Sequence, residues 1–216
     1  MSSIRATDAP RKEAFSKLKF FVEPVDRRDQ NGQTALMLAA QQDDKQKVAY
    51  LLSLLFTDVD AADEDGNTPL HYVLERQGNN CGEILHLILA KGAAPDVKNN
   101  NGVTPLMIAA KNGDERSVDM LLIHKATRKT LNSQDNTGDT ALMRAARFNN
   151  LHIVERLLEI PGIDLDLKNN LQLSAFRIAQ NHGFVRIAML LSDKGAAVPI
   201  VKKKPSRAPA SRTYRR

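Results

Sequence analysis

NNNGVTPLMIAAKNGD, residues 99–114, is the stretch that decides the fold of this chain. Its polar tip ends in a glycine, which tolerates the positive φ that other residues resist, so the stretch predicts a tight turn. Thr104 is suited to cap a helix, and Pro105 fits the first helical position, where its missing N–H has no partner to lose. The stretch therefore predicts a turn that leads directly into a short helix.

Nearly the same string occurs five times in one register. The copies are DQNGQTALMLAA (29–40), DEDGNTPLHYVL (63–74), NNNGVTPLMIAA (99–110), DNTGDTALMRAA (135–146) and NNLQLSAFRIAQ (169–180). The residues that follow each turn are spaced by 34, 36, 36 and 34 positions, and they are Thr34, Thr68, Thr104, Thr140 and Ser174. A constant period of this length indicates an array of stacked units.

A second apolar stripe follows each copy at the spacing of a helix. In the first copy the stripe contains Val48, Leu51, Leu52 and Leu55. A glycine and a proline then end the helix in KGAAPD (91–96) and KGAAVP (194–199). One turn with two short helices cannot bury its apolar face by itself, so we expect the units to stack on one another.

The repeated unit resembles an ankyrin repeat, because it has a turn, a T-P-L-H-like start and two helices at a period near 33 residues. The stretches that carry the resemblance are DGNTPLH (65–71), NGVTPLMIAAKNGD (101–114) and LILAKGAAPDVKN (87–99). The resemblance implies an all-α ankyrin-repeat solenoid of about five helix-turn-helix repeats, with hairpin tips and terminal caps. It also implies that His71, in the T-P-L-H position, makes a structural hydrogen bond at the start of its helix.

We expect three parts along the chain. Residues 1–12 are predicted to be a flexible N-terminal segment, 13–200 the ankyrin-repeat domain, and 201–216 a basic disordered tail. Within the domain we expect an N-terminal partial repeat at 13–28 and repeats that start near 29, 63, 99, 135 and 169. The fifth copy has Gln172 where the others have the turn glycine. Its hairpin is therefore either remodelled or covered by something apolar, and we favour remodelling.

The sequence predicts no catalytic, cofactor-binding or metal-binding residues. It contains no H-E-x-x-H, no G-x-S-x-G, no phosphate-cradling glycine loop followed by lysine, and no pair of cysteines for zinc. The single cysteine, Cys81, is expected to be a small buried apolar group. We therefore expect a protein that is not an enzyme and needs no cofactor.

The resemblance implies a binding scaffold, because ankyrin arrays recognise other proteins through hairpin tips and the inner faces of first helices. Carried over by position, the candidate partner-binding residues of the concave face are Gln33, Gln41, Gln42, Asn67, Glu75, Arg76, Val103, Lys111, Asn112, Asp139, Arg147, Phe148, Leu171, Leu173 and His182. Much of this face is Asn and Gln, which favours a polar protein surface over nucleic acid, since phosphate contacts need Lys and Arg.

One part of this face is predicted to be apolar. Arg147 and Phe148, with Leu171 and Leu173 on the next hairpin, would combine apolar groups with an arginine, as interface hot spots do. The alternative is that Phe148 folds under its own loop and Leu173 packs on the hairpin.

The net charge of +6 belongs to the end of the chain. The tail from 202 to 216 has no acidic residue, and its basic residues are Lys202, Lys203, Lys204, Arg207, Arg212, Arg215 and Arg216. Three interpretations stay open: an inert solvated tail, a nuclear import signal, or a segment that orders on an acidic partner such as RNA, an acidic protein surface or anionic lipid.

These features predict a scaffold or adaptor that binds a protein partner through its concave ankyrin surface. The alternative is a structural subunit of a large assembly, either cytoskeletal or axonemal or a ribonucleoprotein, anchored by the basic tail on an acidic partner. No apolar run reaches the roughly 18 residues of a membrane span, and the amino terminus lacks a signal peptide's apolar core. We expect an intracellular, cytoplasmic protein, with the cytoskeleton or nucleus as alternatives, and nothing implies a homo-oligomer.

Overall fold

The computed structural model describes residues 27–196. The predicted segment 1–12, nearly all of the partial repeat 13–28 and the basic tail lie outside the described residues. Between residues 27 and 196 the regular structure is helical, with no strand. The helices are α2 (Ala35–Gln41), α3 (Lys45–Ser53), α4 (Pro69–Arg76), α5 (Cys81–Ala90), α6 (Pro105–Asn112), α7 (Glu115–Leu122), α8 (Lys125–Lys129), α9 (Ala141–Arg147), α10 (Leu151–Leu158), α11 (Ala175–Asn181) and α12 (Val185–Asp193).

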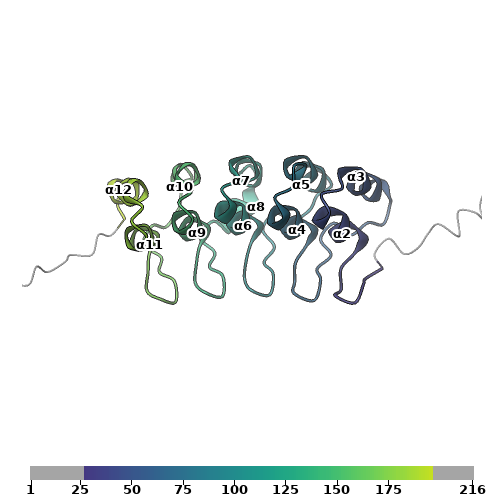
Figure 1. The fold of residues 1–216 in the computed structure, drawn as a ribbon, viewed down its shortest axis with the longest axis horizontal. Helices are drawn as coiled ribbons and strands as arrows, with labels where there is room; N and C mark the ends of the chain where they lie inside the picture. Colours follow the sequence, from purple (N-terminus) through teal and green to yellow (C-terminus); the bar gives the residue numbers. More distant parts are fainter. Residues whose placement is uncertain (1–26, 197–216) are drawn as a thin grey trace, which may run out of the picture.

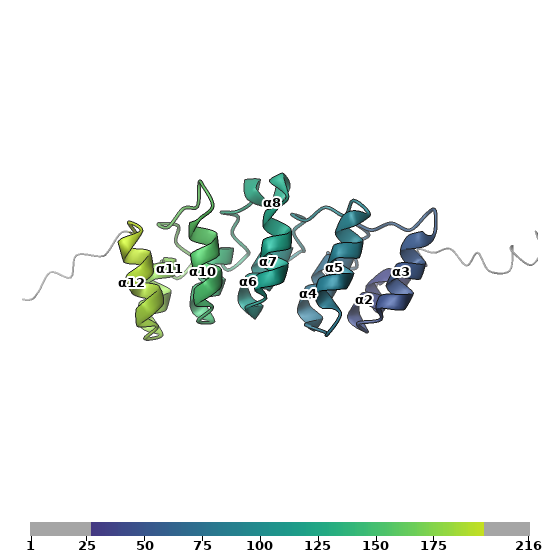
Figure 2. The ribbon, with the colours of Figure 1, turned by 90° about the horizontal axis from the view of Figure 1, so that it is seen from above.

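The helices stand in pairs that line up side by side (Figure 1). The first helices of the pairs (α2, α4, α6, α9 and α11) form one layer, and the second helices (α3, α5, α7, α10 and α12) form the other. The loop that precedes each first helix projects away from both layers. Seen from above, the second helices follow one another along the length of the molecule, and the short α8 follows α7 (Figure 2). The predicted all-α solenoid is confirmed.

Each first helix begins as its sequence predicts. Thr34, Thr104, Thr140 and Ser174 are N-caps whose side-chain oxygens accept a backbone N–H three residues further on. Such a cap stabilises a helix by about 1 kcal/mol.

His71 takes part in the cap of α4. The backbone N–H of Thr68 donates to its Nδ1 at 3.2 Å, and its Nε2 lies 3.0 Å from the carbonyl oxygen of Val103 in the next repeat. Because Nδ1 accepts, Nε2 carries the proton and donates to Val103. The predicted structural hydrogen bond is confirmed, and it also joins two repeats.

The core runs without interruption along the array. Small residues let the first helices approach closely, and the alanine pairs at 39–40, 109–110 and 145–146 are buried. The stripes of the second helices fill the space between the layers, with Val48, Leu51 and Leu52 buried in α3. The prediction that Leu55 belongs to this stripe is wrong. Because α3 ends at Ser53, the Leu55 side chain is 92% exposed.

Asparagine side chains tie the third, fourth and fifth loops each to the loop before it. Backbone N–H groups donate to carbonyl oxygens across these junctions, for example from Asn136 to Asn101 at 2.9 Å. The Nδ2 groups of Asn100, Asn136 and Asn170 also donate across, to the carbonyl oxygens of residues 64, 100 and 136 at 2.8, 3.0 and 3.0 Å. These asparagines therefore hold the loops in line.

The fifth loop has the same conformation as the others, so the predicted remodelling is wrong. The Asn169 N–H donates to Leu173 O at 3.1 Å and the Gln172 N–H donates to Asn169 O at 2.8 Å, as at the matching positions of the third loop. Gln172 adopts a φ of 60°, in the left-handed region that glycine occupies elsewhere. The Asn169 Oδ1 holds this turn, because it accepts the N–H groups of Leu171 and Leu173, each at 3.0 Å.

Candidate functional site

The candidate site is the inner surface, formed by the loops and the exposed side of the first helices. The predicted residues fall into two rows along the array. The loop row, just before the first helices, is Gln33, Asn67, Val103, Asp139, Leu171 and Leu173. The helix-end row, where the first helices end, is Gln41, Gln42, Glu75, Arg76, Lys111, Asn112, Arg147, Phe148 and His182. A first helix of seven or eight residues, roughly 11 Å, separates the rows.

The polar side chains of the loop row hold repeats together. Gln33 Nε2 donates to the hydroxyl of Tyr72 in the next repeat at 2.5 Å, and that hydroxyl donates to the Asp63 carboxylate. Burial and the bond to Asp63 raise the pKa of Tyr72 to about 12. Further along, Asn99 Nδ2 donates to Asn67 Oδ1 at 2.8 Å. These groups are occupied within the array and are poorly placed to receive a partner.

Asp139 is 7% exposed, so the prediction that it is an exposed contact residue is wrong. Its Oδ1 accepts from Asn169 Nδ2 at 2.7 Å and its Oδ2 accepts from Arg147 Nη2 at 2.6 Å. The carboxylate therefore lies between the fourth and fifth repeats and fixes the Arg147 guanidinium at the end of α9.

A second buried carboxylate stands four residues before it. Asp135 accepts from Arg144 Nη2 at 2.6 Å and from the Thr137 hydroxyl at 2.6 Å. Burial would raise the pKa of Asp135, but the hydrogen bonds from Thr137 and Arg144 outweigh burial and hold the pKa below its usual value. Both arginines of α9 are therefore neutralised within their own repeat.

The accessible side chains of the inner surface lie mainly in the helix-end row. Apart from Asn112 and Arg147, its members are exposed. Asn112 is half-buried and donates from Nδ2 to Leu74 O at 2.7 Å, which makes it a link between repeats. His182 is exposed and its ring stacks on Phe184, with centroids 5.6 Å apart.

Phe148 is the large apolar member of the helix-end row. It follows α9 and is 49% exposed, so it does not fold under its own loop. The ammonium of Lys111, from the preceding repeat, lies 5.9 Å from the centroid of its ring, which is a cation–π geometry. The Lys111–Phe148 pair was not predicted, because the two residues are 37 positions apart.

The apolar patch predicted from four residues is divided in the structure. Arg147 and Phe148 lie at the end of α9, whereas Leu171 and Leu173 lie in the loop before α11. Leu171 is 72% exposed, and Leu173 packs against the core. Leu173 thus follows the alternative prediction, and Phe148 has Lys111 as its neighbour.

The described residues offer neither a reactive thiol nor a cluster of metal ligands. Burial raises the pKa of the Cys81 thiol to about 11, so the thiol is protonated at neutral pH. Cys81 is buried, as predicted. Across residues 27–196 no three His, Cys, Asp or Glu side chains gather where they could hold a metal ion. Over the same residues, no helix has the length and apolar character that a membrane crossing requires.

A family model described as ankyrin repeats (3 copies) matches residues 8–93 and 76–169, more than half of the chain. The chain belongs to the ankyrin-repeat family. Ankyrin repeats are a non-catalytic fold that generally mediates protein–protein interaction, which agrees with the paired helices and loops described above.

Several curated proteins match about half of the chain. It is 33% identical over 119 residues to "Protein glp-1" of Caenorhabditis elegans, covering 50% of this chain and 9% of that protein. It is 35% identical over 115 residues to "Tyrosine-protein kinase Shark" of Drosophila melanogaster, covering 53% and 12%. It is 37% identical over 102 residues to "Ankyrin repeat domain-containing protein 53" of Mus musculus, covering 44% and 20%. The chain thus spans a fifth or less of the length of these relatives.

Proposed function

We propose that this chain is a protein-interaction adaptor that receives its partner on the helix-end row, with Phe148 as the apolar anchor. The half-exposed Phe148 ring beside the Lys111 ammonium is the observation that carries the proposal. Aromatic side chains, Phe among them, are enriched in the cores of protein interfaces. Because Asp139 already orients Arg147, little side-chain entropy is lost there when a partner binds.

The rest of the row favours a polar protein surface as the partner. It begins with the uncharged Gln41 and Gln42, continues with Glu75 beside Arg76, and ends with His182. Charges of both signs and amide groups suit the hydrogen-bonding rim of a protein interface. A nucleic acid would need a run of unpaired cations, and the two arginines of α9 are paired with aspartates.

Co-purification with variants of the full-length chain tests this proposal. Phe148→Ala should reduce recovery of the bound partner at least tenfold, because a hot-spot truncation costs about 2 kcal/mol or more. Val185→Ala, which removes an equally accessible apolar side chain from α12, is the matched control and should leave recovery unchanged. Equal recovery with Phe148→Ala and wild type, at unchanged helix content and melting temperature, would show that the anchor is wrong.

The basic tail supports a second candidate function, a subunit anchored on an acidic partner in a large assembly. Seven basic residues and no acidic one follow Val201. A chain ending at Val201 should then lose its association with a large particle, and full-length binding to single-stranded RNA would show a log–log salt slope of about −5. Retention of the same partners by the shortened chain would reject this candidate. The compartment, proposed as cytoplasmic, would follow the partner found.

A further inference from the structure

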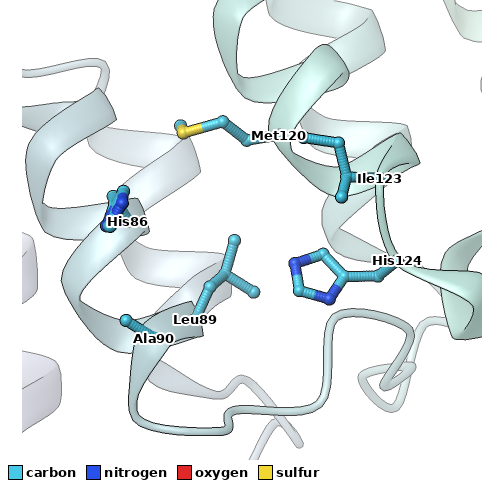
Figure 3. Close-up of a pocket in the computed structure, with 6 residues that line it drawn as sticks. All are labelled: His86, Leu89, Ala90, Met120, Ile123 and His124. Atoms are coloured by element: carbon cyan, nitrogen blue, oxygen red, sulfur yellow. The ribbon is translucent and has the colours of Figure 1, made fainter.

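A hollow of about 240 Å³ lies away from the inner surface, between the second helices α5 and α7. It is lined by His86, Leu89, Ala90, Met120, Ile123 and His124. Figure 3 shows Leu89 and the His124 ring extending between the two helices, with Ile123 and Met120 above them. The Ile123 side chain, at the end of α7, is 71% exposed.

The size of the hollow suits one inserted side chain. At ~30 Å³ per water molecule it holds about eight waters, and pockets for whole small ligands are larger, roughly 300–1,000 Å³. The lining is mostly aliphatic, with two histidine rings among it. A large apolar side chain of a partner would displace water that has few hydrogen-bonding groups around it.

The two neighbouring grooves are bridged by ion pairs. Between α7 and α10, Arg156 Nη2 lies 2.7 Å from Asp119 Oδ1, and Arg156 Nη1 lies 2.8 Å from Glu159. Between α3 and α5, Lys45 pairs with Glu83. Arg156 and Glu159 stand 36 positions after Met120 and Ile123, the spacing of those repeats, so charged groups in the fourth repeat replace the apolar lining of the third.

The segment beside the hollow lacks the acidic residues that its counterparts carry. The connectors after α3, α5 and α10 contain aspartates at 58, 60, 96, 164 and 166. The connector after α7, residues 123–134, has no acidic residue and carries Lys125, Arg128 and Lys129 in α8. Arg128 Nε donates to Leu122 O at 2.7 Å, which holds its guanidinium at the end of α7 next to Ile123. The exposed Lys91 follows Ala90 at the end of α5.

We propose that the α5–α7 hollow is a second docking site, which takes an acidic segment of a protein partner. The segment inserts one large apolar side chain between Leu89 and Ile123, and its flanking carboxylates pair with the cations of α8 and with Lys91. Charge complementarity identifies the occupant, because an apolar hollow with cations on both sides attracts an apolar group among anions. The site lies on the second-helix layer, so its occupant can bind while another protein occupies the helix-end row.

The test uses a displayed library of random twelve-residue peptides, selected on the full-length wild-type chain and counter-selected on Ile123→Glu. Ile123 has ordinary helical geometry at an exposed position, so a glutamate is tolerated there. Its carboxylate would replace an apolar side chain of the lining and repel an acidic peptide. The selected peptides should carry a large apolar residue with two or more Asp or Glu within a few positions. Their affinity should fall at least tenfold on Ile123→Glu and about threefold on Lys125→Gln.

Val185→Glu, the same kind of change on α12, is the matched control and should bind these peptides like wild type. Phe148→Ala should also bind them like wild type, so the experiment can reject this docking site without rejecting the proposed adaptor surface, and the reverse. A pool without acidic enrichment, or affinities that Ile123→Glu leaves unchanged, would overturn the proposal. Binding to phosphatidylserine vesicles that Ile123→Glu abolishes, with no such peptide pool, would also overturn it and assign the hollow to an anionic membrane.

Discussion

Asn169 donates from its Nδ2 to the Oδ1 of Asp139 at 2.7 Å, across the junction between the fourth and fifth repeats. Both residues are buried. Because the other carboxylate oxygen accepts from Arg147, one side chain joins a loop, the loop of the next repeat and the end of α9. A position that looks like a surface contact in the sequence is thus a structural joint.

Replacing Asp139 by alanine should lower the free energy of unfolding by about 2–3 kcal/mol, because the buried Asn169 amide loses its acceptor and the Arg147 guanidinium its partner. Urea denaturation of the full chain measures this. Asp65→Ala, at an exposed loop position, is the control and should change stability by less than about 0.5 kcal/mol. Equal effects of the two changes would contradict the assigned role of Asp139.

His71 should make the array less stable in mild acid. Burial lowers the pKa of His71. The hydrogen bond to Val103 and the charge of Asp63 raise this pKa, but by less, so the net shift is downward. Above a pH of about 6.5 the imidazole is neutral in both states. As pH falls further, the unfolded state takes up the proton first, so stability declines until the folded pKa is reached, with a slope of up to ~1.4 kcal/mol per pH unit.

The chain supplies a matched variant for this measurement. Met37 and Met107 occupy the position of His71 in the first and third repeats, so His71→Met keeps a native side chain for that place. Urea unfolding at pH 7.5, 6.0 and 5.0 should show a steeper loss for wild type than for His71→Met. Parallel pH profiles would mean that His71 does not titrate with folding.

Gln172→Gly should stabilise the protein by roughly 0.5–1 kcal/mol. Gln172 has a φ of 60°, and this left-handed conformation costs an L-residue roughly 1–2 kcal/mol. Glycine avoids that cost, but it loses more backbone entropy on folding, so only part of the cost is recovered as stability. Thermal unfolding at one protein concentration measures the gain. A lower melting temperature would show that the Gln172 side chain makes a contact worth more than the strain.

Gly138→Ala should have the opposite effect and destabilise the array by about 2 kcal/mol or more. A Cβ at Gly138 would lie 2.7 Å from the backbone nitrogen of Asn170, which is a steric clash. The φ of 80° at this position adds a second cost, because alanine resists a left-handed conformation. Denaturant unfolding measures the loss. Gly162→Ala serves as the control, since its φ of 89° is similar but no heavy atom lies within 4 Å of the added Cβ. A loss no greater than in the control would contradict the clash.

The fold could be predicted because its determinants are local. A turn, an N-cap and a proline or alanine at the first helical position stand within six residues of one another in each copy. The bond of His71 was expected from the resemblance of its segment to the T-P-L-H start of ankyrin repeats. The turn glycines were predicted from φ alone. The structure adds a second reason, which is that the next loop lies against glycines such as Gly66 and Gly138. Within the described residues Gln172 has no following loop, and this explains why a side chain is tolerated there.

The site could be predicted only in part, because its accessibility depends on neighbouring repeats. A polar residue in a turn looks the same whether it faces solvent or bonds to the next loop, as Asp139 and Asn67 do. Asparagine at the same place in three successive copies, Asn100, Asn136 and Asn170, is the signal that could have revealed the loop-to-loop bonds. The α5–α7 hollow needed the structure, since its lining residues come from two successive repeats.

The order of side chains along the helix-end row bears on which partners fit it. Stacked helices lie roughly 8–10 Å apart, so each step along the row presents a different chemical group. At the position eight residues after each cap these groups are Gln42, Arg76, Asn112, Phe148 and His182. A partner displaced by one repeat would place its apolar group over Asn112 or His182 and lose the aromatic contact. On the proposed adaptor function, the array would select partners by the order and spacing of the groups along their length.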